Sequence, residues 1–328
     1  MRTRLPMITK LIDYIKKEIC SCDLSGSRSQ VSVLHLDIYR ARNERALLFV
    51  FEGRERYPRY VAKYVKHRDF ERDLYNEFTN YTLLYNKVSS RVKSSMPKPI
   101  CLYDKGSTLA AIERGVPGES IASLIDHNAS SRKILRYIEA AFDFLSLFQN
   151  ETKKECKFDD IERQKLIGRP VTLFCETFQL SRAKRALIEK IKDDVVNYLV
   201  DQSQLFSCHG DYWPKNIVAH RNKVYVIDWP LYMEAYLGFW DYCTLIFNTR
   251  VKSRIRRLRL EEMKRGYMRG LGIYPDIERE INLIYLAIRT IWHKYRHGMA
   301  NEWDRRWKVL FDRELCSYEV SRRGKSVA

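Results

Sequence analysis

The sequence predicts an α+β protein in which a small antiparallel β-rich part precedes a larger, mainly helical part. Two patterns predict this order. Short β-branched and aromatic runs recur between residues 31 and 66, whereas apolar residues spaced by three or four positions dominate after residue 118. Of the 328 residues, 45% are apolar and 12% are aromatic, so the chain can bury a substantial core.

The strand predictions rest on β propensity and on the residues that separate the runs. Turn-like or charged segments such as Arg42-Asn43-Glu44 and Glu52-Gly53-Arg54 divide the first three runs, which favours an antiparallel meander. The expected strands cover residues 31–38, 45–52, 59–66, 99–103 and 108–113.

Helices and a domain boundary follow from the apolar spacing. Amphipathic helices are expected at residues 8–19, 69–88, 134–148, 187–199 and 277–291. The segment 114–118 holds two glycines and a proline and is expected to be a hinge. We therefore expect an N-terminal lobe of residues 1–113 and a helical C-terminal lobe of residues 119–328.

The charge balance and the cysteines exclude several classes of protein. Lys and Arg outnumber Asp and Glu by 59 to 41, a net charge of +18. No apolar run approaches the roughly 20 residues of a membrane-spanning helix, and the charged N-terminus lacks the apolar core of a secretory signal. We expect a cytoplasmic protein, with peripheral membrane association left open, whose eight cysteines are reduced thiols rather than disulfides or metal ligands.

Two carboxylates and an amide gather in one short region. A polar loop between apolar flanks holds Asp211 and Asn216, and the alternating strand pattern that follows ends at Asp228. Phosphoryl transfer needs an oxygen acceptor for the attacking hydroxyl and hard oxygen ligands for Mg²⁺, which these side chains supply. Asp and Asn are also common in ordinary turns, so the N-terminal half must decide between the two interpretations.

The N-terminal half supplies a lysine and a glutamate in the right order. Lys63 shares one strand face with Val61 and Val65, where an unpaired ammonium would be unfavourable. Glu77 lies on the apolar stripe of the helix at 69–88, so it can pair with Lys63, although a surface glutamate would fit the same spacing.

The ordered set His209-Gly-Asp211, Asn216 and Ile227-Asp228-Trp229 resembles the aminoglycoside phosphotransferase and choline kinase superfamily, which has a two-lobed protein kinase-like fold. The resemblance implies that Asp211 orients or deprotonates the acceptor hydroxyl and that Asn216 and Asp228 bind Mg²⁺. It also implies that Lys63 contacts the phosphates of ATP and Glu77 fixes it. The remaining implied roles are a structural one for Asp241 and adenine contacts from the hinge backbone, Glu113 to Gly115.

Other residues near these motifs stay open. No G-x-G-x-x-G is present, and the segment 25–29 around Gly26 is either a phosphate-covering loop or a plain one. Lys215 either touches the γ-phosphate or faces water. His209 is interpreted as a hydrogen-bonded brace rather than an acid or base.

We therefore expect a phosphotransferase that uses ATP and Mg²⁺ on a hydroxyl-bearing small molecule or saccharide. A basic cluster at residues 250–269 and the net charge favour a neutral or anionic acceptor over a polycationic aminoglycoside. The same cluster can also be a solvated helix face. The alternatives are an atypical protein kinase and a non-catalytic nucleotide sensor that binds an anionic polymer, whereas nucleic acid is not an expected partner of the enzyme.

Overall fold

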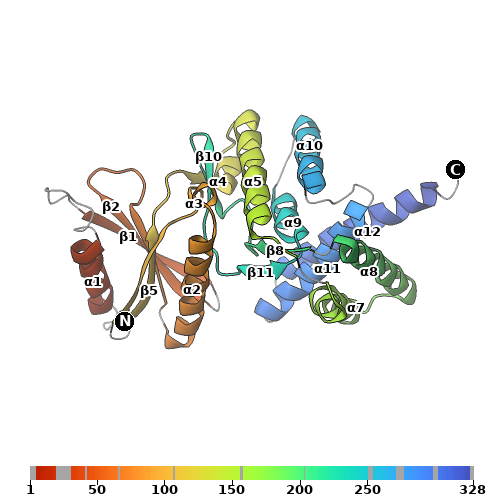
Figure 1. The fold of residues 1–328 in the computed structure, drawn as a ribbon, viewed down its shortest axis with the longest axis horizontal. Helices are drawn as coiled ribbons and strands as arrows, with labels where there is room; N and C mark the ends of the chain where they lie inside the picture. Colours follow the sequence, from red (N-terminus) through yellow and green to blue (C-terminus); the bar gives the residue numbers. More distant parts are fainter. Residues whose placement is uncertain are drawn as a thin grey trace. The chain divides into compact units, whose positions relative to one another are not determined.

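The computed structural model (Figure 1) describes residues 5–19, 31–40, 43–65, 67–105, 108–155, 158–202, 204–249, 254–270, 277–297 and 302–325. The chain forms two compact units: Met1–Phe144 with His209–Tyr232, and Leu145–Cys208 with Met233–Ala328. It passes from the first unit to the second within helix α5 (Ser131–Thr152). These units are not the predicted lobes, and the division into lobes at residues 1–113 and 119–328 with a hinge at 114–118 stays a prediction.

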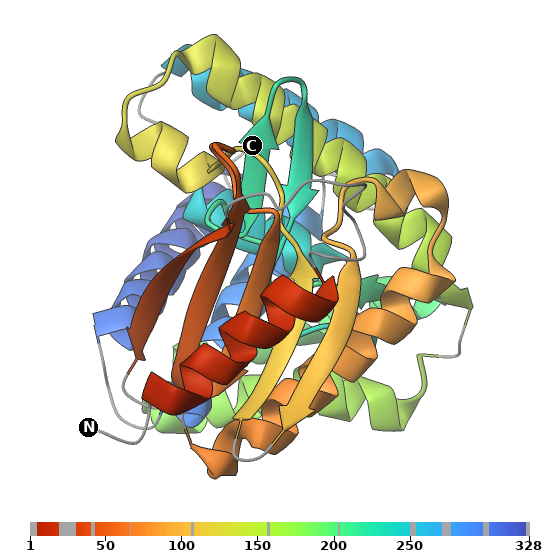
Figure 2. The ribbon, with the colours of Figure 1, turned by 90° about the vertical axis from the view of Figure 1, so that its left-hand side faces the viewer.

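A five-stranded antiparallel sheet with the order β1-β2-β3-β5-β4 forms the centre of the first unit (Figure 2). All five predicted strands are confirmed. Their bounds are β1 Val31–Arg40, β2 Asn43–Glu52, β3 Tyr60–Val65, β4 Pro99–Lys105 and β5 Thr108–Arg114.

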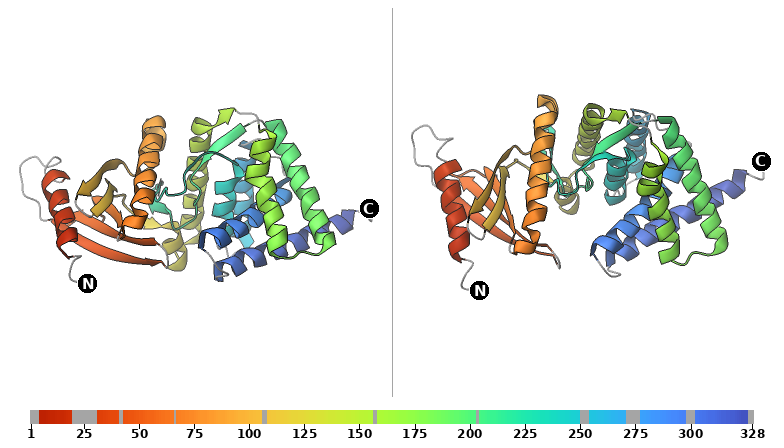
Figure 3. Two further views of the ribbon diagram at one scale, coloured as in Figure 1. Left: turned by 90° about the horizontal axis from the view of Figure 1, so that it is seen from below. Right: turned by 60° about the horizontal axis from the view of Figure 1, so that its bottom comes forward.

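The two faces of this sheet have different partners, and Figure 3 shows helices α1 and α2 on opposite sides of it. Because side chains alternate along a strand, Leu48, Val50 and Ala62 pack under α1 (Leu5–Tyr14) and the π-helical turn η1 (Ile15–Ile19). On the other face, Val65, Leu109 and Ala111 pack with Leu74 of α2 (Glu71–Lys87). The helices expected at 8–19 and 69–88 are thus confirmed.

The remaining elements of the first unit are short. The 3₁₀ turn η3 (Arg68–Phe70) leads into α2, and helices α3 (Ser90–Lys93) and α4 (Ile121–Asp126) follow. A second sheet has the order β10-β9-β6, with β6 at Glu119–Ser120, β9 at Ile217–His220 and β10 at Lys223–Val226. Its two longer strands form a hairpin directly after the polar loop of Asp211 and Asn216.

The second unit is mainly helical, with a small sheet of order β11-β8-β7. Its strands are β7 Lys154–Glu155, β8 Gln204–Cys208 and β11 Met233–Tyr236. Its helices, besides the end of α5, are α6 Asp160–Arg163, η4 Gln164–Gly168, α7 Arg169–Thr177, α8 Arg182–Gln202, α9 Phe239–Asn248, α10 Arg254–Gly270, α11 Glu278–His297 and α12 Glu302–Lys325. The helices expected at 134–148, 187–199 and 277–291 fall within or largely within α5, α8 and α11.

The basic cluster at 250–269 contains one lysine that does not face solvent. Lys264 is 8% exposed and forms ion pairs with Glu261, at 3.0 Å, and with Glu278. Arg265 and Arg269 are exposed, whereas the side chains of residues 250–259 lie outside the described residues. The cluster therefore combines a buried ion pair with surface charge.

Two general expectations can be compared with the described residues. The cysteines among them that are resolved as thiols, Cys101, Cys175, Cys208, Cys243 and Cys316, form no disulfide. Within those same residues, no helix combines the length and the apolar character that crossing a bilayer requires.

Candidate active site

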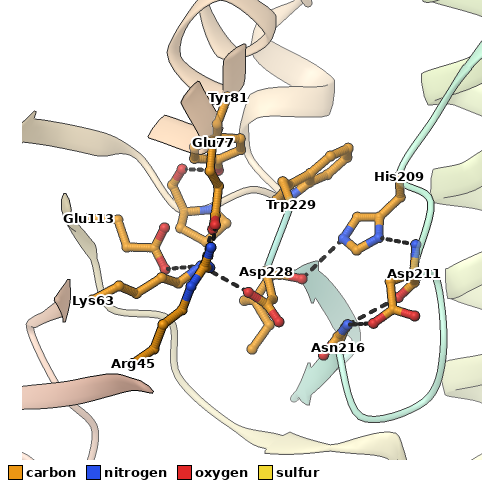
Figure 4. Close-up of polar contacts among 12 residues, drawn as sticks. Arg45, Lys63, Glu77, Tyr81, Glu113, His209, Asp211, Asn216, Asp228 and Trp229 are labelled. Atoms are coloured by element: carbon orange, nitrogen blue, oxygen red, sulfur yellow. Dashed lines mark hydrogen bonds and ion pairs between the residues drawn. The ribbon is translucent and has the colours of Figure 1, made fainter. Parts of the chain in front are cut away.

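Lys63 lies at the centre of a cluster of carboxylates, all within the first unit (Figure 4). Its Nζ is 3.1 Å from Oδ1 of Asp228, 3.3 Å from Oε1 of Glu77 and 3.9 Å from Oε1 of Glu113. These partners come from α2, from β5 and from the segment after β10. The structure therefore brings Lys63, Glu77 and Asp228 together as the motifs predict.

The strand register explains why Lys63 points into this cluster. Lys63 pairs with Leu47 of β2 and Ala111 of β5, on the face opposite to the α1 core. Burial works to lower the pKa of Lys63, but the surrounding carboxylates, Glu113 most of all, raise it above its ordinary value. The ammonium therefore stays charged at neutral pH.

Glu113 contributes a side chain to the site, in addition to the backbone contact that the resemblance implies. Its side chain is 15% exposed and lies beside Lys63. Burial raises the pKa of the Glu113 carboxyl, although the positive charge of Lys63 works in the opposite direction. The amides of Arg114 and Gly115 both donate to carbonyls of neighbouring segments, so these two amides are already used within the chain and not available to adenine.

An apolar row lies next to Lys63 on the same face of the sheet. The register aligns Leu34 of β1 with Phe49 of β2, Phe49 with Val61 of β3, and Val61 with Glu113. Leu34 is 52% exposed, and Phe49 and Val61 are half-buried. The row therefore presents an apolar surface that ends at the carboxylate of Glu113. It lies one pleat away from the ammonium of Lys63.

The loop between β8 and β9 holds Asp211 and Asn216 in contact. Nδ2 of Asn216 donates to the backbone carbonyl of Asp211 at 3.0 Å and to its Oδ2 at 3.2 Å. Gly210 has φ +82°, and a Cβ there would lie 2.3 Å from the carbonyl oxygen of Leu231. Only glycine fits this conformation and this space, so the residue before Asp211 fixes the path of the loop.

His209 is the brace that the sequence predicts. Its Nδ1 accepts from the amide of Asp211 at 3.2 Å, so its Nε2–H donates to the carbonyl of Ile227 at 3.1 Å. Burial lowers the pKa of His209 to about 4, and the imidazole is neutral at pH 7. Because one bond reaches the Asp211 loop and the other the residue before Asp228, His209 connects these two segments.

Aromatic packing supports this brace. The rings of Trp229 and His209 lie 4.4 Å apart, and Trp229 stacks on Tyr81 of α2 at 5.9 Å. The indole Nε1 donates to the carbonyl of Val226 at 3.0 Å. Trp229 is 2% exposed, which agrees with a packing role rather than with substrate stacking.

Asp228 adopts a backbone conformation that few residues other than glycine tolerate. Strand β10 ends at Val226, and Asp228 has φ +64°, so it lies just beyond the strand instead of continuing its alternation. Desolvation by the surrounding protein works to raise the pKa of the Asp228 carboxyl, but the charge and the hydrogen bond of Lys63 hold this pKa below its ordinary value. The side chain remains 43% exposed, so part of the carboxylate is open to a ligand.

Sequence reasoning missed Arg45, which belongs to the same cluster. Its Nη1 donates to Oε2 of Glu77 at 2.5 Å, so Glu77 holds one cation on each oxygen. The signal was the alternation of β2, which places Arg45 on the face of Leu47. Lys215 is exposed and lies over the ring of Trp213 at 4.8 Å, whereas the segment 25–29 lies outside the described residues.

Comparisons with known proteins agree with this geometry. The model of the phosphotransferase enzyme family APH matches residues 44–239, more than half of the chain. No curated protein sequence matches the chain at a significant level.

Solved structures are similar over nearly the whole chain. A choline kinase from Cryptosporidium parvum has 14% identity and a TM-score of 0.56, with 97% of each chain covered. A choline kinase from Streptococcus pneumoniae has 15% identity and a TM-score of 0.56 over 94% of this chain and 100% of that one. An aminoglycoside phosphotransferase from Streptomyces rimosus, solved with ADP and streptomycin, has 16% identity and a TM-score of 0.51 over 86% and 98%. The chain therefore belongs to the phosphotransferase enzyme family and has its protein kinase-like fold.

Proposed function

We propose that the protein transfers the γ-phosphate of ATP to a hydroxyl group of a small molecule or saccharide, with Mg²⁺ as the metal ion. The observation that carries the proposal is the contact of Lys63 with both Glu77 and Asp228, in the same unit as the paired Asp211 and Asn216. Residues separated by up to 165 positions converge as phosphoryl transfer requires.

The nucleotide has a matching surface on the sheet. The apolar row of Leu34, Phe49 and Val61 suits the face of a purine base, and Lys63 one pleat away suits the phosphates. The segment from Glu113 to Gly115 would border the base. The amides of Arg114 and Gly115 are already bonded within the chain, so the carboxylate of Glu113 is the group proposed to meet the edge of the base.

Asn216 and Asp228 fit a magnesium ion. Asn216 uses its amide nitrogen toward Asp211, which leaves its carbonyl oxygen as a ligand, and Asp228 is partly open. Both are hard oxygen donors, and Mg²⁺ is commonly held by one or two such side chains together with phosphate oxygens. When bound, the ion would neutralise phosphate charge during transfer.

Asp211 is placed to act on the acceptor. Its carboxylate is held by Asn216, and its backbone by His209, so its position is fixed before substrate arrives. We infer that it accepts a hydrogen bond from the acceptor hydroxyl and aligns the oxygen with the γ-phosphate. It takes the proton as the new O–P bond forms and the bond from the γ-phosphorus to the bridging oxygen of ADP breaks, so that ADP leaves. Lys63 balances phosphate charge in the same step.

The acceptor class is inferred from charge. A net charge of +18 would repel a polycation, so a neutral or anionic acceptor such as a sugar, an anionic glycan or a phosphorylated metabolite is favoured. The similar structures carry names that refer to choline and to aminoglycosides, which are cationic. This chain therefore departs from those proteins in its expected acceptor.

One experiment tests activity and acceptor together. The protein is incubated with Mg-ATP and a pooled extract of cellular glycans and metabolites, and mass spectrometry searches for a gain of one phosphate. Asp211→Asn should reduce turnover about 10²- to 10⁴-fold while ATP binding stays nearly unchanged. An undiminished rate in this variant would refute the role of Asp211, and phosphate found only on polypeptides would favour a protein kinase.

A further inference from the structure

The ammonium of Lys63 has few donors to spare for a triphosphate. An ammonium offers three N–H groups, and three carboxylates, from Glu77, Glu113 and Asp228, surround that of Lys63. If Asp228 turns to a metal ion, two carboxylates still compete with the phosphates for the same cation. A second positive group near Lys63 would therefore strengthen nucleotide binding.

Arg45 is placed to supply that group. It pairs with Val65 of β3, two positions beyond Lys63, so both side chains lie on the same face of the sheet. A guanidinium carries five N–H donors in a planar fork. Among contacts within the described residues, that of Arg45 makes one bond, through Nη1 to Glu77, and its side chain stays 18% exposed.

Geometry supports the position of Arg45 at the phosphates. Arg45 and Lys63 donate to the two oxygens of the same Glu77 carboxylate, so the guanidinium lies beside the ammonium. The bond of Arg45 to Glu77 fixes the fork in advance, which reduces the entropy lost on binding. The sequence contains no G-x-G-x-x-G, the glycine-rich pattern whose loop covers the phosphates in protein kinases.

We propose that Arg45 is a second phosphate-binding residue, whose guanidinium contacts the triphosphate beside Lys63 while Glu77 holds both cations. This role rests on the proposed function, because it requires that ATP lies over the Lys63 face. The competing explanation is purely structural: Arg45 holds Glu77 in place and never meets the nucleotide. The two explanations differ in whether Arg45→Met still weakens ATP binding when Glu77 has already been replaced by Gln.

The test compares ATP, ADP and adenosine by equilibrium binding to wild type and to Arg45→Met, and ATP binding to Glu77→Gln with and without Arg45→Met. Losing a charge-assisted hydrogen bond should weaken ATP binding about 10- to 100-fold, ADP binding less, and adenosine binding less than about twofold. Arg45→Lys keeps the charge without the fork and should lie between wild type and Arg45→Met. It also provides a folded variant if Arg45→Met is unstable.

The structure offers a matched control. Arg59 forms an ion pair with Glu52 in the same unit, with side chains 19% and 8% exposed, against 18% and 7% for Arg45 and Glu77. Arg59→Met should therefore cost similar stability yet leave ATP affinity within about twofold, since its pair lies outside the Lys63 cluster.

Two results would overturn the inference. One is ATP affinity in folded Arg45→Met within twofold of wild type, and the other is no additional loss of ATP affinity when Arg45→Met is combined with Glu77→Gln, which would indicate that Arg45 acts only through Glu77. If wild type itself binds no ATP, the proposed function fails together with this role. That outcome is distinguishable, because the inference alone fails only where wild type binds ATP.

Discussion

Each compact unit contains a buried lysine paired with carboxylates, and the two differ in how their partners are supplied. Lys264 of the second unit pairs with Glu261, one turn away on α10, and with Glu278 at the start of α11. Lys63 of the first unit has partners 14 and 165 positions away, on a helix and in a loop. In both, burial opposes the charge and the carboxylates raise the pKa of the lysine.

This difference separates a structural ion pair from a binding site. The partners of Lys264 lie on the same helix and the next one, so the cluster needs only those two helices to pack. The cluster of Lys63 requires the sheet, α2 and the segment after β10 all to be in place, and it borders an apolar row that is half-exposed. A site assembled from distant segments beside an open surface is suited to a ligand.

The largest expected difference between Lys63 and Lys264 is the effect of their replacement on catalytic activity. Lys63→Met should lower kcat/KM for ATP about 10²- to 10³-fold, because a preorganised charge at the phosphates is lost. Lys264→Met should keep kcat/KM within about threefold in its folded fraction. Steady-state kinetics at saturating acceptor measure both, and a comparable loss in the two variants would show that the Lys63 cluster is no more specialised than the other.

Replacement of Lys264 should instead lower the free energy of unfolding. Lys264→Met leaves Glu278 buried without its cation, which should cost about 3 kcal/mol in the free energy of unfolding. Replacing both partners, Lys264→Met with Glu278→Leu, should recover most of that loss because no buried charge remains. Denaturant unfolding measures it, with Lys308→Met, which breaks the more exposed Lys308–Asp312 pair on α12, as a control expected within about 0.5 kcal/mol. A double variant no more stable than Lys264→Met would contradict this account.

His209 adds a buried group that stabilises the fold in its neutral form, so its contribution to stability should be lost as the pH falls. Its folded pKa of about 4 lies below the ordinary 6.5, so the unfolded chain takes up a proton first as the pH falls. Wild type should therefore lose about 2 kcal/mol of unfolding free energy between pH 7 and pH 5 through this group, full stability being present above pH 6.5. Urea unfolding at the two pH values should show a smaller loss in His209→Gln, and equal losses in both proteins would disprove the assignment.

The sequence was sufficient where a pattern is local. Alternation along β3 placed Lys63 inward, the helical stripe placed Glu77 toward it, and loop spacing identified Asp211 and Asn216. Pairing between strands is not visible in the pattern of any single strand. For that reason the contact of Glu113 with Lys63, which depends on β3 pairing with β5, could not be foreseen.

Arg45 and the small sheets were missed for related reasons. A charged residue near the start of a strand is usually exposed, and only the packed position of α2 turns Arg45 toward Glu77. Strands of two residues, such as β6 and β7, are too short to show a period. The contacts among the motif residues of the candidate site were thus predictable from the sequence, whereas the second cation, Arg45, was not.

The tight turn at Gly210 offers a practical tool for work in living cells. Gly210→Ala would force the loop away from Leu231 and displace Asp211, yet every ionisable group of the protein would be retained. Such a variant would separate the consequences of a displaced Asp211 from those of altered charge, which Lys63→Met and Asp211→Asn cannot do because both change the net charge. Gly210→Ala is therefore a suitable variant for physiological experiments that need a disrupted Asp211 loop and an unchanged net charge.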